Sequence, residues 1–105
     1  MAYVKRIVCL ANSAKQGGAC IAGHEVLANG YGGWVRPVSD RPGQELGLLE
    51  CIYWNNQFPR LLDLIDVPLQ EAAPLRHQTE NHRIEPGRWW QKAGMKCLSW
   101  AWPIR

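Results

Sequence analysis

A hairpin turn in the first third of the chain limits its possible folds more than any other feature. Asn29-Gly30-Tyr31-Gly32-Gly33 separates two runs of strand-forming residues, 20–27 and 34–39. Asn-Gly between such runs is the strongest short-range signal for a tight β-hairpin, since both central turn positions need positive φ. A third run, residues 3–10, is β-branched and apolar, and a glycine turn at residues 15–18 follows it. Short strands joined by tight turns predict a mainly β fold.

The rest of the chain predicts shorter elements with weaker patterns. Helix-forming residues at apolar spacing indicate helical turns, and apolar runs bounded by proline or glycine indicate strands. We expect short helical turns over residues 44–52 and 86–92, a buried strand over 61–67 that Pro68 stops, and a final strand over 97–102. The sum is one domain over residues 1–105, a small barrel or strongly bent antiparallel sheet with one or two short helical turns.

Two residues inside the expected strands predict irregular pairing. Gly23 lies within residues 20–27, where a glycine indicates a bulge or a close approach of another backbone. Pro37 lies within residues 34–39 and cannot donate a ladder hydrogen bond, which places it at an edge or a bulge. The same edge is where a second copy could pair, so a homodimer stays open.

The composition is that of a globular protein, with 47% hydrophobic and 20% charged residues. No apolar run approaches the roughly 20 residues that span a bilayer, and a polar stretch after Leu10 argues against a signal peptide. We expect a cytoplasmic protein with reduced cysteines, no cofactor and no metal. Cys9 and Cys20 with His24 could supply three zinc ligands, but buried thiols are the favoured interpretation because no CxxC pair occurs.

Tryptophan and arginine indicate a binding role. The chain has six tryptophans and a formal net charge of +3, with basic ends and an acidic middle. Trp34 and Arg36 are two residues apart, so on a strand they share one face, and Arg88 precedes the pair Trp89-Trp90. Indoles stack on nucleobases, while arginine and lysine contact phosphates. At least one of Trp89 and Trp90 is expected to be exposed.

The remaining aromatic and glycine-rich features favour structural roles. Trp100 and Trp102 alternate onto one face and are expected to fill the core. The glycine stretches at residues 15–18 and 28–34 could hold phosphate through backbone amides, but neither matches a phosphate-binding loop, so hairpin turns explain them better.

A polar segment over residues 77–82 is the strongest candidate for catalysis or metal binding. It contains His77, Glu80, Asn81 and His82, which could act as acids, bases or ligands. No serine lies in the context of an activated nucleophile, and no HExxH spacing occurs. We therefore expect a solvated loop and no enzymatic activity.

Several strings, in order along most of the chain, resemble the bacterial and phage family of dual OB-containing domains. They are Arg6-Ile7-Val8-Cys9-Leu10-Ala11-Asn12-Ser13-x-Lys15, Gly18-x-Cys20-Ile21-Ala22-Gly23, Gly33-Trp34-Val35-Arg36-Pro37-Val38-Ser39, Leu61-Leu62-Asp63-Leu64-Ile65-Asp66-Val67-Pro68-Leu69 and His77-Gln78-x-Glu80-Asn81. The resemblance implies a β-barrel related to OB folds and a binding role. The polar or aromatic positions in or beside these motifs are Asn12, Ser13, Lys15, Trp34, Arg36, Ser39, Asp40 and Asn81.

The chain departs from the pattern of this family in two ways, and both narrow the expected binding role. Ala14 and Ala19 stand where basic residues are expected, which weakens the case for duplex binding. The family name implies two barrels, whereas 105 residues have room for one.

The sequence thus predicts a non-catalytic module that binds a nucleotide or single-stranded nucleic acid by tryptophan stacking and Arg/Lys phosphate contacts. The predicted ligand-binding residues are Asn12, Ser13, Lys15, Trp34, Arg36, Ser39, Asn81, Arg88 and Trp89. The alternative is a protein-interaction module of a phage or mobile element that inhibits a host factor, since tryptophan and arginine also dominate protein interfaces.

Overall fold

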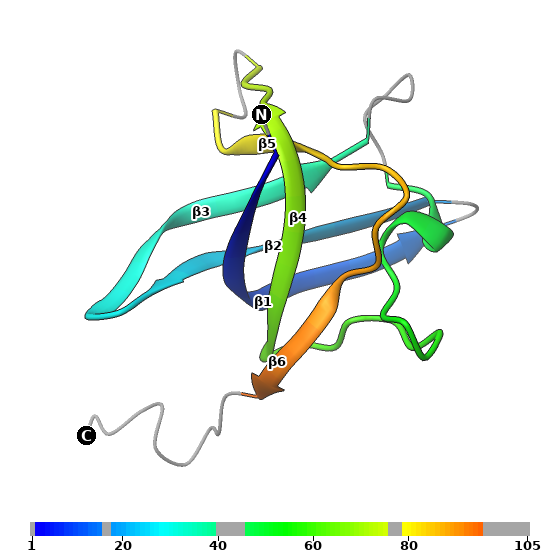
Figure 1. Cartoon of the computed structure of the whole chain (residues 1–105), viewed down its shortest axis with the longest axis horizontal. Coiled ribbons are helices and arrows are strands. Elements are labelled where there is room, and N and C mark those ends of the chain that lie inside the picture. Colours follow the sequence, from blue (N-terminus) through cyan, green and yellow to red (C-terminus); the bar gives the residue numbers. More distant parts are fainter. Residues whose placement is uncertain (1, 16–17, 40–45, 76–78, 96–105) are drawn as a thin grey trace.

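The fold is a β-sheet that closes on itself (Figure 1). The computed structural model describes residues 2–15, 18–39, 46–75 and 79–95. Its elements are β1 (Tyr3–Lys15), β2 (Gly18–Leu27), β3 (Gly30–Val38), the 3₁₀ turn η1 (Leu48–Glu50), β4 (Asp63–Ala72), β5 (Asn81–Ile84) and β6 (Gln91–Met95). Within these ranges no helix is long and apolar enough to cross a membrane.

The strand order makes a Greek key. β1, β2 and β3 form an antiparallel meander, and β4 returns to pair with β1, giving the spatial order 4-1-2-3. β5 then lies between β3 and β4, parallel to β3 and antiparallel to β4. In the described residues these strands form a five-membered ring, as in the five-stranded Greek-key barrel of OB folds. The predicted mainly β fold is confirmed, with one parallel pair in place of a wholly antiparallel sheet.

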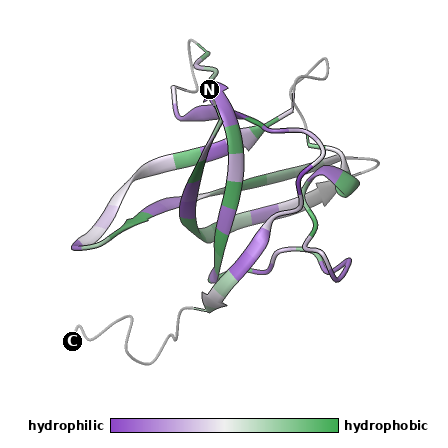
Figure 2. Cartoon of the chain, in the orientation of Figure 1, coloured by the Kyte–Doolittle hydropathy of each residue, from purple (hydrophilic) through white to green (hydrophobic). Residues whose placement is uncertain are grey.

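Alternation along the strands produces the core inside the ring. Ile65, Val67 and Leu69 of β4 point inward and are fully buried, whereas Asp66 lies on the outer face. Figure 2 shows the resulting bands of hydrophobic and hydrophilic residues along β4. The same cluster includes Ile7, Ile21, Val35 and Trp90. The core thereby fixes which side chains of each strand face outward.

Gly23 confirms the expected close backbone approach. A Cβ atom on this residue would lie 1.9 Å from the carbonyl oxygen of Val8 on β1. The β1–β2 register shifts between Cys9 and Ala11, directly beside the Cys9–Gly23 pair. The absence of a side chain therefore lets β1 bend across β2 as the ring closes.

The two prolines inside strands lie where no ladder donor is needed. The expectation that Pro37 lies at an edge or a bulge was wrong, because β3 pairs with both β2 and β5; Pro37 pairs with His82 of β5 and lies beyond the end of the β2–β3 ladder. The prediction that Pro68 ends its strand was wrong, because β4 continues to Ala72. The Pro68 carbonyl oxygen accepts from the Glu85 amide, so the Pro68 nitrogen faces the same side of β4. On that side Pro68 lies between the part of β4 that pairs with β6 and the part that pairs with β5, where no ladder donor is needed.

The helical turn expected over residues 86–92 was also wrong. Gly87 has φ +81° in a turn, and the chain then forms β6, which pairs with Asp63–Asp66 of β4. That edge of β4 would otherwise be open, so ladder hydrogen bonds outweigh local helix propensity. Of the turn expected over residues 44–52, only η1 forms in the described part. The strand expected over residues 97–102, with Trp100 and Trp102, lies outside the described residues.

Candidate functional site

The outer surface of β2 and β3 places one half-exposed indole on a fixed support. Trp34 on β3 pairs with His24 on β2, and their ring centroids are 4.3 Å apart at an interplanar angle of 36°. His24 Nδ1 donates to the Gly32 carbonyl at 3.0 Å, which fixes the imidazole. The neighbouring Val35 is buried, so alternation directs Trp34 outward, where half of its surface is exposed. One side of the indole is thus supported while the other can accept a planar ligand.

Arg36 lies on the same outer face, as the sequence spacing predicted, and ties three segments together. Its Nη1 donates to Cys20 Sγ on β2 at 2.9 Å. Its Nε lies 3.4 Å from Glu80 Oε2 in the connection between β4 and β5. The Arg36 amide donates to the Glu80 carbonyl at 3.0 Å. The guanidinium is therefore held at one end of this surface with its charge partly balanced.

β1 contributes one exposed polar side chain to the same surface. Ser13 is exposed and stands opposite Cys20 in the β1–β2 ladder, so both side chains lie on one face. Asn12 is half-buried, and its Nδ2 donates to the Pro59 carbonyl at 2.8 Å. The side chain of Lys15, at the end of β1, lies outside what the structure describes. We call the surface formed by Ser13, Cys20, His24, Trp34 and Arg36 the β2–β3 face.

Two predicted site residues lie inside the protein. Ser39 is fully buried, and its hydroxyl donates to Glu50 Oε2 at 3.1 Å, which links the end of β3 to η1. Asn81 is fully buried where β5 pairs with Arg36 of β3. A ligand on the β2–β3 face contacts neither side chain, so these residues support the face from within.

Arg88 and Trp89 come from a different part of the molecule. Trp89 is 61% exposed and Trp90 only 1%, which confirms that one of the two indoles is exposed. Arg88 Nη1 donates to Glu85 Oε1 at 2.7 Å. Trp90 forms a parallel bridge with Tyr53, so this segment lies beside the loop between β3 and β4 rather than on the β2–β3 face.

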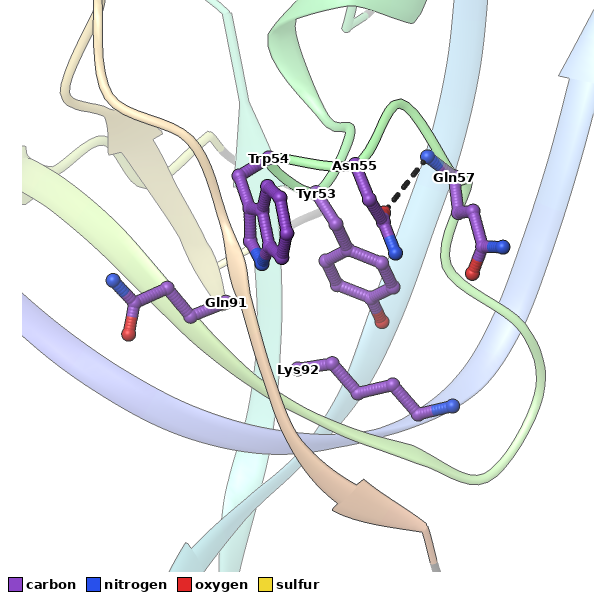
Figure 3. Close-up of a pocket in the computed structure, with 6 residues that line it drawn as sticks. All are labelled: Tyr53, Trp54, Asn55, Gln57, Gln91 and Lys92. Atoms are coloured by element: carbon purple, nitrogen blue, oxygen red, sulfur yellow. Dashed lines mark hydrogen bonds between the residues drawn. The ribbon is translucent and has the colours of Figure 1, made fainter.

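Beside that bridge lies a pocket that sequence reasoning missed. It has a volume of about 320 Å³ (Figure 3). Its lining is Tyr53, Trp54, Asn55, Gln57, Gln91 and Lys92, which we call the Trp54 pocket. The run of an indole and three amide residues at positions 54–57 was the available signal. The contribution of Gln91 and Lys92 depends on strand pairing and has no local signal.

The cysteine and histidine groups of the described residues do not form a metal site. No cluster of three His, Cys, Asp or Glu side chains occurs in these ranges. Cys9 is buried while Cys20 is exposed, so the ligand set considered with His24 does not assemble. Burial raises the pKa of the Cys9 thiol to about 11 and that of Cys51 to about 12, which keeps both protonated.

The imidazole at the start of β5 has a structural contact. His82 Nδ1 and the Tyr3 hydroxyl are hydrogen-bonded at 2.7 Å. Burial, followed by the Lys5 charge, lowers the pKa of His82 below 6.5, which favours the neutral ring. Glu80 pairs with Arg36, and His77 lies outside the described residues.

The family model for the dual OB-containing domain matches residues 5–101. The chain belongs to this family. No curated protein and no solved structure matches it. Strands β2 and β3 correspond to the second and third strands of an OB fold, and Trp34 of β3 lies on their outer surface.

Proposed function

We propose that this dual OB domain is a non-catalytic module that binds single-stranded nucleic acid on the β2–β3 face, with a base stacked on Trp34. OB folds bind oligonucleotides on the surface of strands 2 and 3, flanked by the loops between strands 1 and 2 and between strands 4 and 5. The observation that carries the proposal is the half-exposed indole of Trp34, supported on one side by His24 in the middle of that surface.

The fixed indole lowers the entropic cost of stacking. His24 is itself held by the Gly32 carbonyl, so little side-chain freedom remains to be lost when a base binds. Base–aromatic stacking contributes about 1–3 kcal/mol per base and tolerates any sequence. Ser13 and Arg36 supply polar contacts next to the indole. A free nucleotide can use the same contacts but stacks only one base.

Charge supports a strand better than a duplex. Acidic and basic side chains balance among those that the structure describes, and several form ion pairs, such as Lys5 with Glu25. The excess positive charge of the sequence comes from other positions, among them Lys15 before β2 and Arg76 between β4 and β5. In OB folds the connections between strands 1 and 2 and between strands 4 and 5 flank the binding surface. Such modest charge suits a few phosphates near stacked bases rather than a long duplex.

Fluorescence anisotropy with labelled single-stranded DNA and RNA 12-mers at low salt tests the proposal. Trp34→Ala should weaken binding about 5- to 150-fold, the equivalent of 1–3 kcal/mol of stacking. Leu61→Ala, which also truncates an exposed apolar side chain but lies off the face, should leave affinity within twofold. Failure of the wild type to bind any strand at low salt, or equal binding by the Trp34 variant, would refute the proposal.

A further inference from the structure

The Trp54 pocket begins with a rigid turn. The Tyr53 amide donates to the Gln57 carbonyl at 3.0 Å, and the Asn56 amide donates to the Tyr53 carbonyl at 2.9 Å. Asn56 has φ +67°, a left-handed conformation that asparagine tolerates better than most residues. The turn therefore fixes the backbone of Trp54, whose side chain is 69% exposed. An exposed indole on a fixed turn is available to a ligand.

The opposite wall comes from the start of β6. Tyr53 and Trp90 pair in a parallel bridge, and both side chains are buried. Their neighbours Trp54 and Gln91 consequently point to the solvent side. In Figure 3 Gln91 lies on one side of the Trp54 ring, while Lys92 extends beneath Tyr53. Two segments about 35 residues apart thus form a single pocket.

The floor of the pocket keeps its charge close to neutral. The Tyr53 hydroxyl donates to Asp63 Oδ2 at 2.8 Å, and the Arg60 amide donates to the same oxygen at 3.0 Å. Asp63 Oδ1 accepts no hydrogen bond from the described residues and faces the Lys92 ammonium at 3.5 Å. Asp63 is only 1% exposed, so its carboxylate balances Lys92 but is out of reach of a ligand.

Asn55 and Lys92 present donors to the pocket, while the Gln57 and Gln91 amides can donate or accept. Asn55 Oδ1 already accepts from the Gln57 amide at 3.2 Å, which leaves the Asn55 NH₂ group for a ligand. Lys92 brings an ammonium group with three N–H donors, only one of which is needed for Asp63. A ligand that fits must therefore offer a flat face to Trp54 and acceptor atoms at its edge.

We propose that the Trp54 pocket binds one unstacked nucleobase that has a carbonyl where adenine and cytosine have an amino group, that is guanine, uracil or thymine. Aromatic stacking of an unstacked base, with hydrogen bonds to its edge, is a general mode of single-strand recognition. Lysine and amide donors match the O6 and N7 acceptors of guanine or a pyrimidine carbonyl. A volume near 320 Å³ is at the lower end for ligand pockets, which suits a single base.

Two other ligand classes fit less well. A sugar ring also stacks on tryptophan, but Asp63, the carboxylate beside the pocket, is buried, which leaves only the neutral Gln57 and Gln91 amide oxygens to accept from its hydroxyls. A phosphate would need a cation with spare charge, whereas Lys92 is balanced by Asp63. The proposal does not depend on the β2–β3 face, because no residue of the pocket belongs to β2 or β3.

Uncharged nucleosides are the direct probe, since they carry a base without phosphate. Guanosine, uridine, cytidine and adenosine are titrated into ¹⁵N-labelled protein, and indole and side-chain amide signals are followed by NMR. We expect guanosine and uridine to shift the Trp54 indole signal, identified by its loss in Trp54→Ala, and to bind at least fivefold more tightly than adenosine. Trp54→Ala should weaken binding about 5- to 150-fold, and Asn55→Ala roughly 2- to 10-fold.

Matched variants separate this pocket from the β2–β3 face. Trp89→Ala removes another exposed indole, 61% exposed against 69% for Trp54, and should leave the nucleoside affinity measured at the Trp54 indole signal within twofold. Nucleoside binding that survives Trp54→Ala, equal affinity for all four nucleosides, or binding of methyl glycosides in their place would overturn the proposal. Oligonucleotide binding by Trp34→Ala tests the β2–β3 face alone, so either proposal can be refuted without the other.

Discussion

Replacing Tyr53 with phenylalanine tests the buried polar contact that supports the Trp54 pocket. Tyr53 is only 3% exposed. The substitution keeps its ring and removes only the hydroxyl that donates to Asp63 Oδ2 at 2.8 Å. Burial, followed by the hydrogen bond to Asp63, raises the pKa of Tyr53, so the hydroxyl stays a donor throughout the neutral range. The variant therefore isolates one hydrogen bond to a buried charge.

The expected loss of stability follows from what Asp63 retains. Hydrogen bonds to charged groups contribute about 1.5–3 kcal/mol, and a buried acceptor left without its donor costs a similar amount. The Arg60 amide still donates to Asp63 Oδ2, so we place the loss at about 2 kcal/mol. For a domain of this size that corresponds to a decrease in Tm of roughly 10 °C.

Urea denaturation followed by circular dichroism measures the free energy of unfolding. A double-mutant cycle with Asp63→Asn should give a coupling energy of about 1–2 kcal/mol, because the two side chains are in direct contact. A loss below about 0.5 kcal/mol in Tyr53→Phe, together with an additive cycle, would refute the inference that this contact stabilises the floor of the pocket.

Three further measurements test other parts of the structure. Gly23→Ala should destabilise the fold by about 3 kcal/mol in thermal denaturation, because its Cβ would meet the Val8 carbonyl oxygen at 1.9 Å; unchanged stability would contradict the close approach. Iodoacetamide at pH 8, with peptide mapping, should modify exposed Cys20 well before buried Cys51, and bound oligonucleotide should slow the reaction at Cys20 several-fold. Burial lowers the pKa of His82 in the folded state, so the stability that the neutral ring contributes is complete above pH 6.5 and is lost as the pH falls below that value. In urea titrations at pH 5–8, His82→Gln should make this decline in the free energy of unfolding shallower.

Local patterns were sufficient to predict the meander and the position of Trp34. Turn residues and alternation indicated strands where β1, β2 and β3 occur, and the two-residue spacing placed Trp34 and Arg36 on one face. Gly23 was also informative, because a glycine inside a strand has few other uses. These features depend on residues close together in the chain.

The closure of the ring could not be predicted in this way. Arg6 pairs with Asp66, sixty residues away, and the parallel contact joins Arg36 to Asn81, 45 residues away. Local helix signals at residues 86–92 indicated the wrong structure because they do not report the open edge of β4. Burial of Ser39 depends equally on closure, since a polar residue at a strand end is exposed in most local contexts.

The ion pairs explain why stacking, and not charge, should dominate recognition by this domain. Arg36 is the described cation nearest to Trp34 on the β2–β3 face, and its guanidinium already faces Glu80. A phosphate that approaches Arg36 must compete with this carboxylate, so the net gain from the contact is small. On a single strand each phosphate neutralised adds about 0.7 to the magnitude of the slope of log affinity against log salt, so a face with few spare cations should show a shallow slope. Affinity then comes chiefly from Trp34, and a short, flexible strand that can unstack its bases satisfies this face better than a duplex, whose bases are already stacked.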